Sequence, residues 1–168
     1  MIDTQDYKQV LGAFPTGVTV VTALDEEGCL VGFTASAFSA VSMDPPLVLI
    51  CPSLNSDSYP VIKRNGRFAI HILGHDQQAI AYRFAGKGKN KGEGIDWRCS
   101  ELQNALICGA AAYLECRVWE DYPGGDHAIL VGEVEKLWCG GDQVDPLLYC
   151  RGKMDQLPEN LRALARAS

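Results

Sequence analysis

Short runs in which apolar and β-branched residues predominate recur along this chain, and Gly, Pro, Asp or Asn separate them. Such runs are typical of β-strands. They predict strands at 17–24, 29–35, 38–42, 47–51, 67–73, 110–121, 127–139 and 146–151. Helical spacing of apolar residues predicts helices over 3–14, with Asp3 or Thr4 as N-cap, over 76–84 and from 157 onward. The segment 52–66 predicts a loop that leads into a short helix.

The predicted strands are joined mainly by turns rather than by helices. This arrangement favours an antiparallel closed barrel over a parallel sheet built from βαβ units. A barrel also removes exposed sheet edges, which suits strands as apolar as these. No internal repeat or low-complexity tract divides the sequence. We therefore expect one mainly β domain over residues 1–168, with a few flanking helices.

One stretch departs from the strand pattern because its side chains are too small to fill a core. It is Thr34-Ala35-Ser36-Ala37, between the apolar residues Phe33 and Phe38. Small residues in a strand let another backbone or a flat ligand approach the peptide groups closely. The pattern alone fits either a tightly packed sheet crossing or a shelf for such a ligand.

Composition and charge narrow the class of protein. The 168 residues carry a net charge of −6 and are 47% hydrophobic, which is ordinary for a globular domain. A nucleic-acid-binding surface over the whole domain is not expected at this charge. The N-terminus has no signal pattern and no apolar run approaches membrane-spanning length, so we expect a cytoplasmic protein without membrane association.

The seven cysteines, at positions 29, 51, 99, 108, 116, 139 and 150, contain no C-x-x-C pair. Their odd number and the apolar runs around most of them predict buried core thiols rather than disulfides or a zinc site.

Few side chains offer reactive chemistry of their own. The sequence has no G-x-S-x-G elbow and no prominent carboxylate pair. The glycine-lysine segment 86–94 matches neither a dinucleotide fingerprint nor a Walker A loop. It is either a solvated surface loop or a mobile flap whose Lys87, Lys89 and Lys91 meet phosphate. His127 is either a capped loop histidine or a site residue. The chain is therefore a binding module, or a cofactor performs the chemistry.

Five motifs in series resemble one family. They are FPTGVTVVT at 14–22, GFTASAF at 32–38, SMDPPLV at 42–48, GDH at 125–127 and PLLY at 146–149. Together they resemble the flavin reductase-like proteins with an FMN-binding split barrel. The resemblance is strongest to the small reductase components of two-component flavin monooxygenases.

The resemblance implies a set of site residues. Flavin contacts are expected from Pro15, Thr16, Gly17 and Val18 at the border of the ring, from Thr34, Ala35, Ser36, Ala37 and Phe38 along it, from Ser53, Ser56 and Ser58 near the ribityl phosphate, and from Arg83, Phe84 and Ala85 near the phosphates or the adenylate. Ser36 is expected near flavin N5. His127, with Tyr149 nearby, is expected to face the nicotinamide nucleotide. Ser36 and His127 would act by positioning, since hydride transfer needs no general acid.

The resemblance also implies a function. NADH or NADPH would reduce FMN or FAD, and the reduced flavin would diffuse to a partner monooxygenase. The family implies a homodimer. The alternative is an FMN-binding module for electron transfer or storage that does not turn over free flavin.

Overall fold

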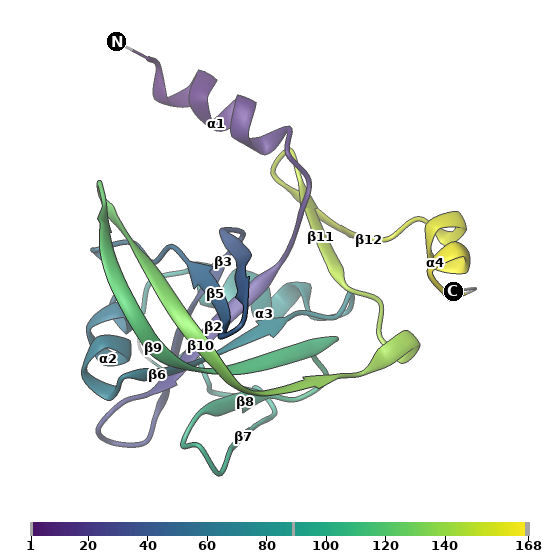
Figure 1. The fold of residues 1–168 in the computed structure, drawn as a ribbon. Coiled ribbons are helices and arrows are strands. Elements are labelled where there is room, and N and C mark those ends of the chain that lie inside the picture. The colour runs from purple at the N-terminus through teal and green to yellow at the C-terminus, as the bar shows by residue number, and fades with distance from the viewer. Residues whose placement is uncertain (1, 89, 167–168) are drawn as a thin grey trace.

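The computed structural model describes residues 2–88 and 90–166 (Figure 1). The helices are α1 (Thr4–Gly12), α2 (Ser58–Asn65), α3 (Gln78–Ala85), the short 3-10 helix η1 (Gly141–Gln143) and α4 (Glu159–Arg166). The strands are β1 (Thr16–Gly17), β2 (Thr19–Leu24), β3 (Leu30–Ala35), β4 (Phe38–Met43), β5 (Pro46–Ile50), β6 (Arg67–Ile72), β7 (Trp97–Cys99), β8 (Ala105–Ile107), β9 (Ala112–Gly124), β10 (His127–Cys139), β11 (Leu147–Cys150) and β12 (Lys153–Gln156). Among these residues, no helix is long and apolar enough to cross a membrane.

A seven-stranded sheet, in the order β3-β2-β6-β9-β10-β5-β4, forms the centre of the molecule. The described strand pairs are all antiparallel. The prediction of a mainly antiparallel β fold with few helices is therefore confirmed. The expected closed ring of strands is not, because β3 and β4 remain the end strands of this sheet within the described residues. The chain passes from one end strand to the other through Ser36 and Ala37 alone.

Both faces of β2 are buried, which explains its uninterrupted apolar sequence. Val20 belongs to a core cluster that also contains Phe84 of α3, whereas Val21 belongs to a second cluster with Ile62 of α2. Successive side chains of a strand point to opposite faces, so the two clusters lie on opposite sides of the sheet. The helices α2 and α3 cover these two faces near β2 and β3.

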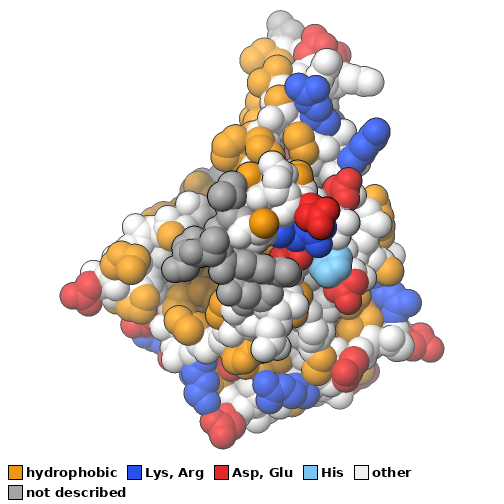
Figure 2. Space-filling model, turned by 90° about the vertical axis from the view of Figure 1, so that its right-hand side faces the viewer, with side chains coloured by type: hydrophobic (Ala, Val, Ile, Leu, Met, Phe, Trp, Pro, Cys, Tyr) orange, Lys and Arg blue, Asp and Glu red, His pale blue; other side chains and the backbone are white. Residues whose placement is uncertain are grey.

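The helix α1 stands apart from the sheet on an arm (Figures 1 and 2). It begins as predicted, because the Asp3 carboxylate accepts hydrogen bonds from the backbone N–H groups of Gln5 and Asp6. None of its residues is buried. Its apolar side chains therefore point to solvent in this single chain rather than into a core. The space-filling view shows hydrophobic side chains along this arm (Figure 2).

The prediction that the cysteines are core thiols is wrong for most of them. Cys29, Cys99 and Cys139 are exposed, and only Cys116 is fully buried. The exposed thiols lie at strand ends or beside turns, where the apolar run no longer faces the interior. Burial raises the pKa of the Cys116 thiol to about 12.

Candidate functional site

A cavity of about 530 Å³ opens beside the link between β3 and β4. We call it the shelf cavity. Three walls form it: the link itself, the loop that leads into α2, and the end of α3 with the basic segment after it. Its lining residues are Phe33, Thr34, Ala35, Ser36, Ala37, Cys51, Ser53, Asn55, Ser56, Asp57, Phe84, Ala85, Gly86, Lys87, Lys91 and His127.

The stretch Thr34–Ala37 forms the first wall. This position agrees with the interpretation of its small residues as a shelf for a flat ligand. Thr34 donates its hydroxyl to the Ala81 carbonyl at 2.5 Å, which fixes this wall against α3. Gly32, just before it, leaves room for the Phe84 ring, since a Cβ there would lie 2.9 Å from Phe84 Cε1. Ser36 and Ala37 are exposed and present little side chain to the cavity. The backbone beside the cavity is thus accessible to a flat ligand.

Hydroxyl groups line the second wall. Ser53 Oγ accepts the N–H of Asn55, and Ser56 Oγ accepts the N–H of Ser58, each at 3.3 Å. Each hydroxyl keeps its own hydrogen, which can rotate to donate to a ligand in the cavity. The wall ends at the start of α2, where the positive end of the helix dipole favours an anion, although the N–H groups of Ser58 and Tyr59 are already bonded to Ser56. This combination suits a phosphate group.

A partly buried lysine lies at the third wall. Lys91 donates to the Gly32 carbonyl at 2.9 Å and to the Phe84 carbonyl at 3.1 Å. Burial lowers the pKa of its ammonium group, and the nearby Asp57 carboxylate opposes that shift. These two bonds attach this part of segment 86–94 to the body of the protein. Lys87 also lines the cavity, and Lys89 lies outside the described residues.

His127 completes the cavity at the start of β10. Its bridge to Ser53 places it next to the hydroxyl-lined wall. Its Nδ1 lies 2.7 Å from Asp126 Oδ1, and this hydrogen bond holds the pKa of the Asp126 carboxyl below its usual range. The His127 side chain is 45% exposed, so a ligand in the cavity can reach it.

Several predicted site residues lie elsewhere. Pro15, Thr16, Gly17 and Val18 are absent from the lining of the shelf cavity, and Thr16 instead pairs with Tyr149 where β1 meets β11. The hydroxyl oxygen of Thr16 is buried there without a hydrogen-bond partner among the described residues. Tyr149 packs against a core cluster and does not line the cavity with His127.

Three more predicted residues do not line the shelf cavity, although each is next in sequence to a residue that does. Phe38 packs against the core cluster around Phe68. Ser58 is buried and lines a neighbouring cavity instead. Arg83 points into a shallow groove beside Lys87 and donates to the Glu93 carbonyl.

Other lining residues were not predicted. Cys51 was interpreted as a core thiol, yet the pairing of Ile50 with Phe38 places it next to Ala37 at the cavity. Asn55 and Asp57 lie among the predicted residues Ser53, Ser56 and Ser58. That position was the only feature of the sequence that pointed to them. Within the part of the chain described, no group of three or more metal-ligating side chains gathers.

The arrangement therefore offers small residues beside an accessible backbone, hydroxyl donors, a helix start and basic side chains. It suits a planar ligand that carries an anionic tail. Residues 11–158 match the family model described as the flavin reductase like domain.

Individual relatives agree with that match. The reductase subunit HsaB of a flavin-dependent monooxygenase from Mycobacterium tuberculosis is 41% identical over 90% of this chain and 81% of its own length. The FMN reductase (NADH) SmoA of Agrobacterium fabrum is 39% identical over 89% of this chain and 84% of its own. The solved NADH:FAD oxidoreductase SgcE6 of Streptomyces globisporus, in complex with NAD and FAD fragments, superposes with a TM-score of 0.87 at 34% identity, covering 95% of this chain and 98% of that one.

Proposed function

This chain belongs to the flavin reductase-like family, and we propose that it is an NAD(P)H:flavin oxidoreductase that supplies reduced flavin to a partner monooxygenase. The shelf cavity carries the proposal, because three segments far apart in sequence meet there with the chemistry that a flavin needs. When bound, the flavin supplies the redox chemistry by accepting a hydride from NADH or NADPH. The relatives named above act on FMN in one case and FAD in another, so both remain candidate substrates.

The residues of this chain would bind and orient the reactants. The backbone along Thr34–Ala37 would lie against the ring system, and Ser36 would stand beside its reacting edge. Ser53, Ser56 and the start of α2 would hold the phosphate. His127, exposed at the mouth of the cavity, would orient the nicotinamide nucleotide. Orientation of two bound reactants accounts for a large part of such a rate acceleration.

We also propose that the sheet curves into a split barrel. The end strands β3 and β4 are joined by only two residues, so the two ends of the seven-stranded sheet must approach each other at that point. That approach forms the wall of the shelf cavity. The proposal treats residues 1–168 as one domain that acts in the cytoplasm, where seven free thiols suit a reducing environment.

The apolar face of α1, continued by Phe14 just beyond its end, supports a homodimer. Tyr7, Val10, Leu11 and Phe14 are between 55% and 73% exposed in the single chain. A contiguous exposed apolar surface of this kind marks an interaction site. A second copy of the chain would cover it. Reduced flavin would reach the monooxygenase by diffusion.

Turnover separates the enzyme from the alternative, a module that only holds FMN. Purified protein is mixed with NADH and a large excess of FMN, and NADH oxidation is followed by absorbance. Oxidation well beyond one equivalent per chain is expected. Oxidation that stops at one equivalent would favour the storage or relay module.

A matched pair of variants ties that turnover to the shelf cavity. Ser36→Trp fills the cavity and is expected to lower flavin affinity by about tenfold or more. Ser39→Trp places the same side chain at an exposed position of β4 outside the cavity lining and is expected to behave like the unmodified protein. Equal flavin affinity in both variants would exclude the shelf cavity as the site.

A further inference from the structure

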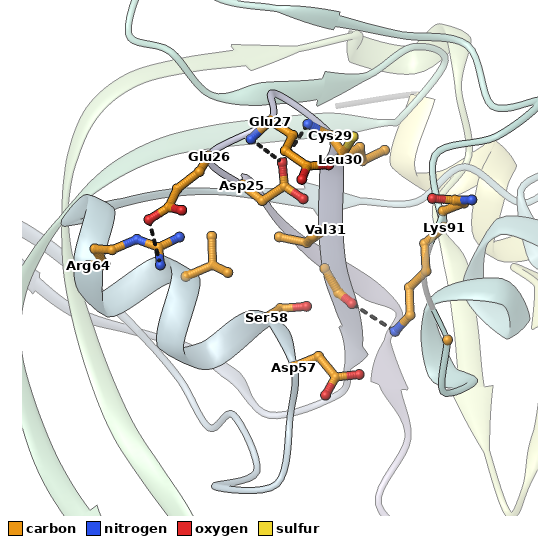
Figure 3. A pocket seen from close by; sticks show the side chains of 14 residues that line it. Asp25, Glu26, Glu27, Cys29, Leu30, Val31, Asp57, Ser58, Arg64 and Lys91 are labelled. Atoms are coloured by element: carbon orange, nitrogen blue, oxygen red, sulfur yellow. Dashed lines mark hydrogen bonds and ion pairs between the residues drawn. The ribbon is translucent and has the colours of Figure 1, made fainter.

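One acidic side chain lies among the groups that suit a phosphate. Asp57 stands between Ser56 and Ser58, just before α2, and it lines the shelf cavity as well as the neighbouring cavity that Figure 3 shows. Its carboxylate lies on the side of α2 that faces Lys91 (Figure 3). Ser53 and Ser56 on the same wall would hold a phosphate, whereas a carboxylate repels one. The charge of Asp57 therefore acts against the other groups of this wall.

Asp57 does not stabilise the start of α2 as a cap. An Asp at this position normally accepts hydrogen bonds from the first N–H groups of the helix. The Asp57 side chain accepts no such bond, and the N–H of Ser58 donates to Ser56 Oγ instead. Asp57 is also exposed. Its carboxylate is therefore available to a ligand in the cavity, and its charge can be removed without breaking a cap.

Asp57 also lies close enough to Lys91 to act on its charge. Burial lowers the pKa of the Lys91 ammonium group, and the Asp57 carboxylate opposes that shift. The ammonium group donates to the Gly32 and Phe84 carbonyls, and these bonds hold it in place beside α3. Asp57 thus offsets part of the positive charge that Lys91 would offer to a phosphate.

This effect depends on which flavin is bound. The ring system, which we place against Thr34–Ala37, is uncharged before it is reduced. A phosphate monoester, in contrast, carries a charge of about −1.5 to −2 at pH 7. FMN has such a group and riboflavin has none. The Asp57 carboxylate therefore repels FMN but not riboflavin.

We propose that Asp57 is a specificity-determining residue, which lowers the affinity of this reductase for phosphorylated flavins relative to riboflavin. The inference deepens the proposed function and rests on it, because it uses the flavin site assigned there. FMN would gain hydrogen bonds from Ser53 and Ser56, and the repulsion by Asp57 would offset part of that gain. The bound FMN would consequently leave the shelf cavity more readily than the serines and Lys91 alone would allow.

Removal of the charge tests the proposal. Asp57→Asn keeps the size of the side chain and suits the start of a helix equally well. Titration with each flavin, followed by flavin fluorescence, is expected to give a dissociation constant for FMN about fivefold below that of the unmodified protein. The dissociation constant for riboflavin should not change. An FMN affinity that stays the same or falls, or an equal gain for both flavins, would overturn the proposal.

Two further variants separate the charge from its structural surroundings. Asp57→Glu retains the charge and is expected to bind both flavins like the unmodified protein. Asp76→Asn removes the same charge at an exposed position just before α3, outside the cavity lining, and is expected to change neither dissociation constant. If either variant raised FMN affinity as much as Asp57→Asn does, the effect would not be a local repulsion and the proposal would fail.

Salt gives an independent readout on the same proteins. The interaction between exposed charges is screened over a distance that shrinks from about 8 Å at physiological ionic strength to about 3 Å at ~1 M. The gain in FMN affinity from Asp57→Asn should therefore become smaller as salt is added. A gain that is independent of salt would contradict a charge effect.

Turnover keeps this proposal separate from the proposed function. If the unmodified protein oxidises NADH with FMN while Asp57→Asn leaves FMN affinity unchanged, only the assignment of Asp57 is wrong. If neither FMN nor riboflavin supports NADH oxidation, the proposed function itself is wrong.

Discussion

At the scale of single residues, His127 gives the sharpest test of the proposed nicotinamide contact. Its side chain is half exposed and lies beside Ser53 at the mouth of the shelf cavity. His127→Ala is expected to raise the KM for NADH by about tenfold, because one hydrogen bond to a charged group contributes ~1.5–3 kcal/mol. Flavin affinity, measured by fluorescence, should stay unchanged.

The matched control is His75→Ala, which removes an exposed histidine that lies outside the cavity lining. It is expected to leave both quantities unchanged. An unaltered KM in the His127 variant would remove this histidine from the nicotinamide contacts.

His71 predicts how stability depends on pH. It is fully buried between β2 and β8, where its Nδ1 lies 3.1 Å from the Val20 carbonyl oxygen and its Nε2 accepts the N–H of Ile107. Burial lowers the pKa of His71 from 6.5 to about 4, and the hydrogen bond to Val20 only partly opposes this. The unfolded chain therefore takes up a proton near pH 6.5, whereas the folded chain resists it until near pH 4.

The stabilisation from neutral His71 is thus present above pH 6.5 and is lost as the pH falls toward 4. Its contribution to the free energy of unfolding should fall by about 3 kcal/mol across that range. Denaturant unfolding at several pH values measures this. His71→Gln should lose this component of the slope while His75→Ala keeps it, and equal slopes in both variants would contradict the assignment.

At the scale of elements, the sequence predicted long strands best. The β2–β3 and β9–β10 hairpins lie where the apolar runs and the intervening turns placed them. β7, β8 and β12 were missed, because three or four residues are too few to show a period. β8 depends on tertiary partners instead, since Thr22 donates to the Ala105 carbonyl and Ile107 donates to His71.

The candidate site likewise has one part that a local sequence pattern predicts and other parts that depend on tertiary structure. The shelf at Thr34–Ala37 could be predicted because its residues are consecutive and share one unusual property, small size. The place of Cys51 depends on the register of β4 against β5, and that of Lys91 depends on how segment 86–94 folds over β3. Neither register nor loop path is encoded in a local pattern.

At the scale of the whole molecule, the exposed apolar face of the arm that carries α1 leads us to expect a homodimer. Val10→Asp places a charge in the middle of the exposed apolar face, where Val10 is 71% exposed. The dimer dissociation constant is expected to rise by about tenfold or more, because burying an unpaired charge in an interface costs several kcal/mol. Sedimentation velocity over a range of protein concentrations measures it.

Gln9→Asp introduces a carboxylate at the neighbouring polar position of α1 and should leave the sedimentation unchanged. A Val10→Asp protein that sediments like the unmodified one would show that α1 does not form the interface.

The bond from Lys91 to the Gly32 carbonyl has one more consequence. The edge of a sheet whose peptide groups lack partners is a template on which another chain can add a strand, and such addition begins fibril growth. β3 is an end strand of the seven-stranded sheet. Because Lys91 already occupies the carbonyl of Gly32 and brings a positive charge to the edge, we expect another chain to add to β3 less readily at this point.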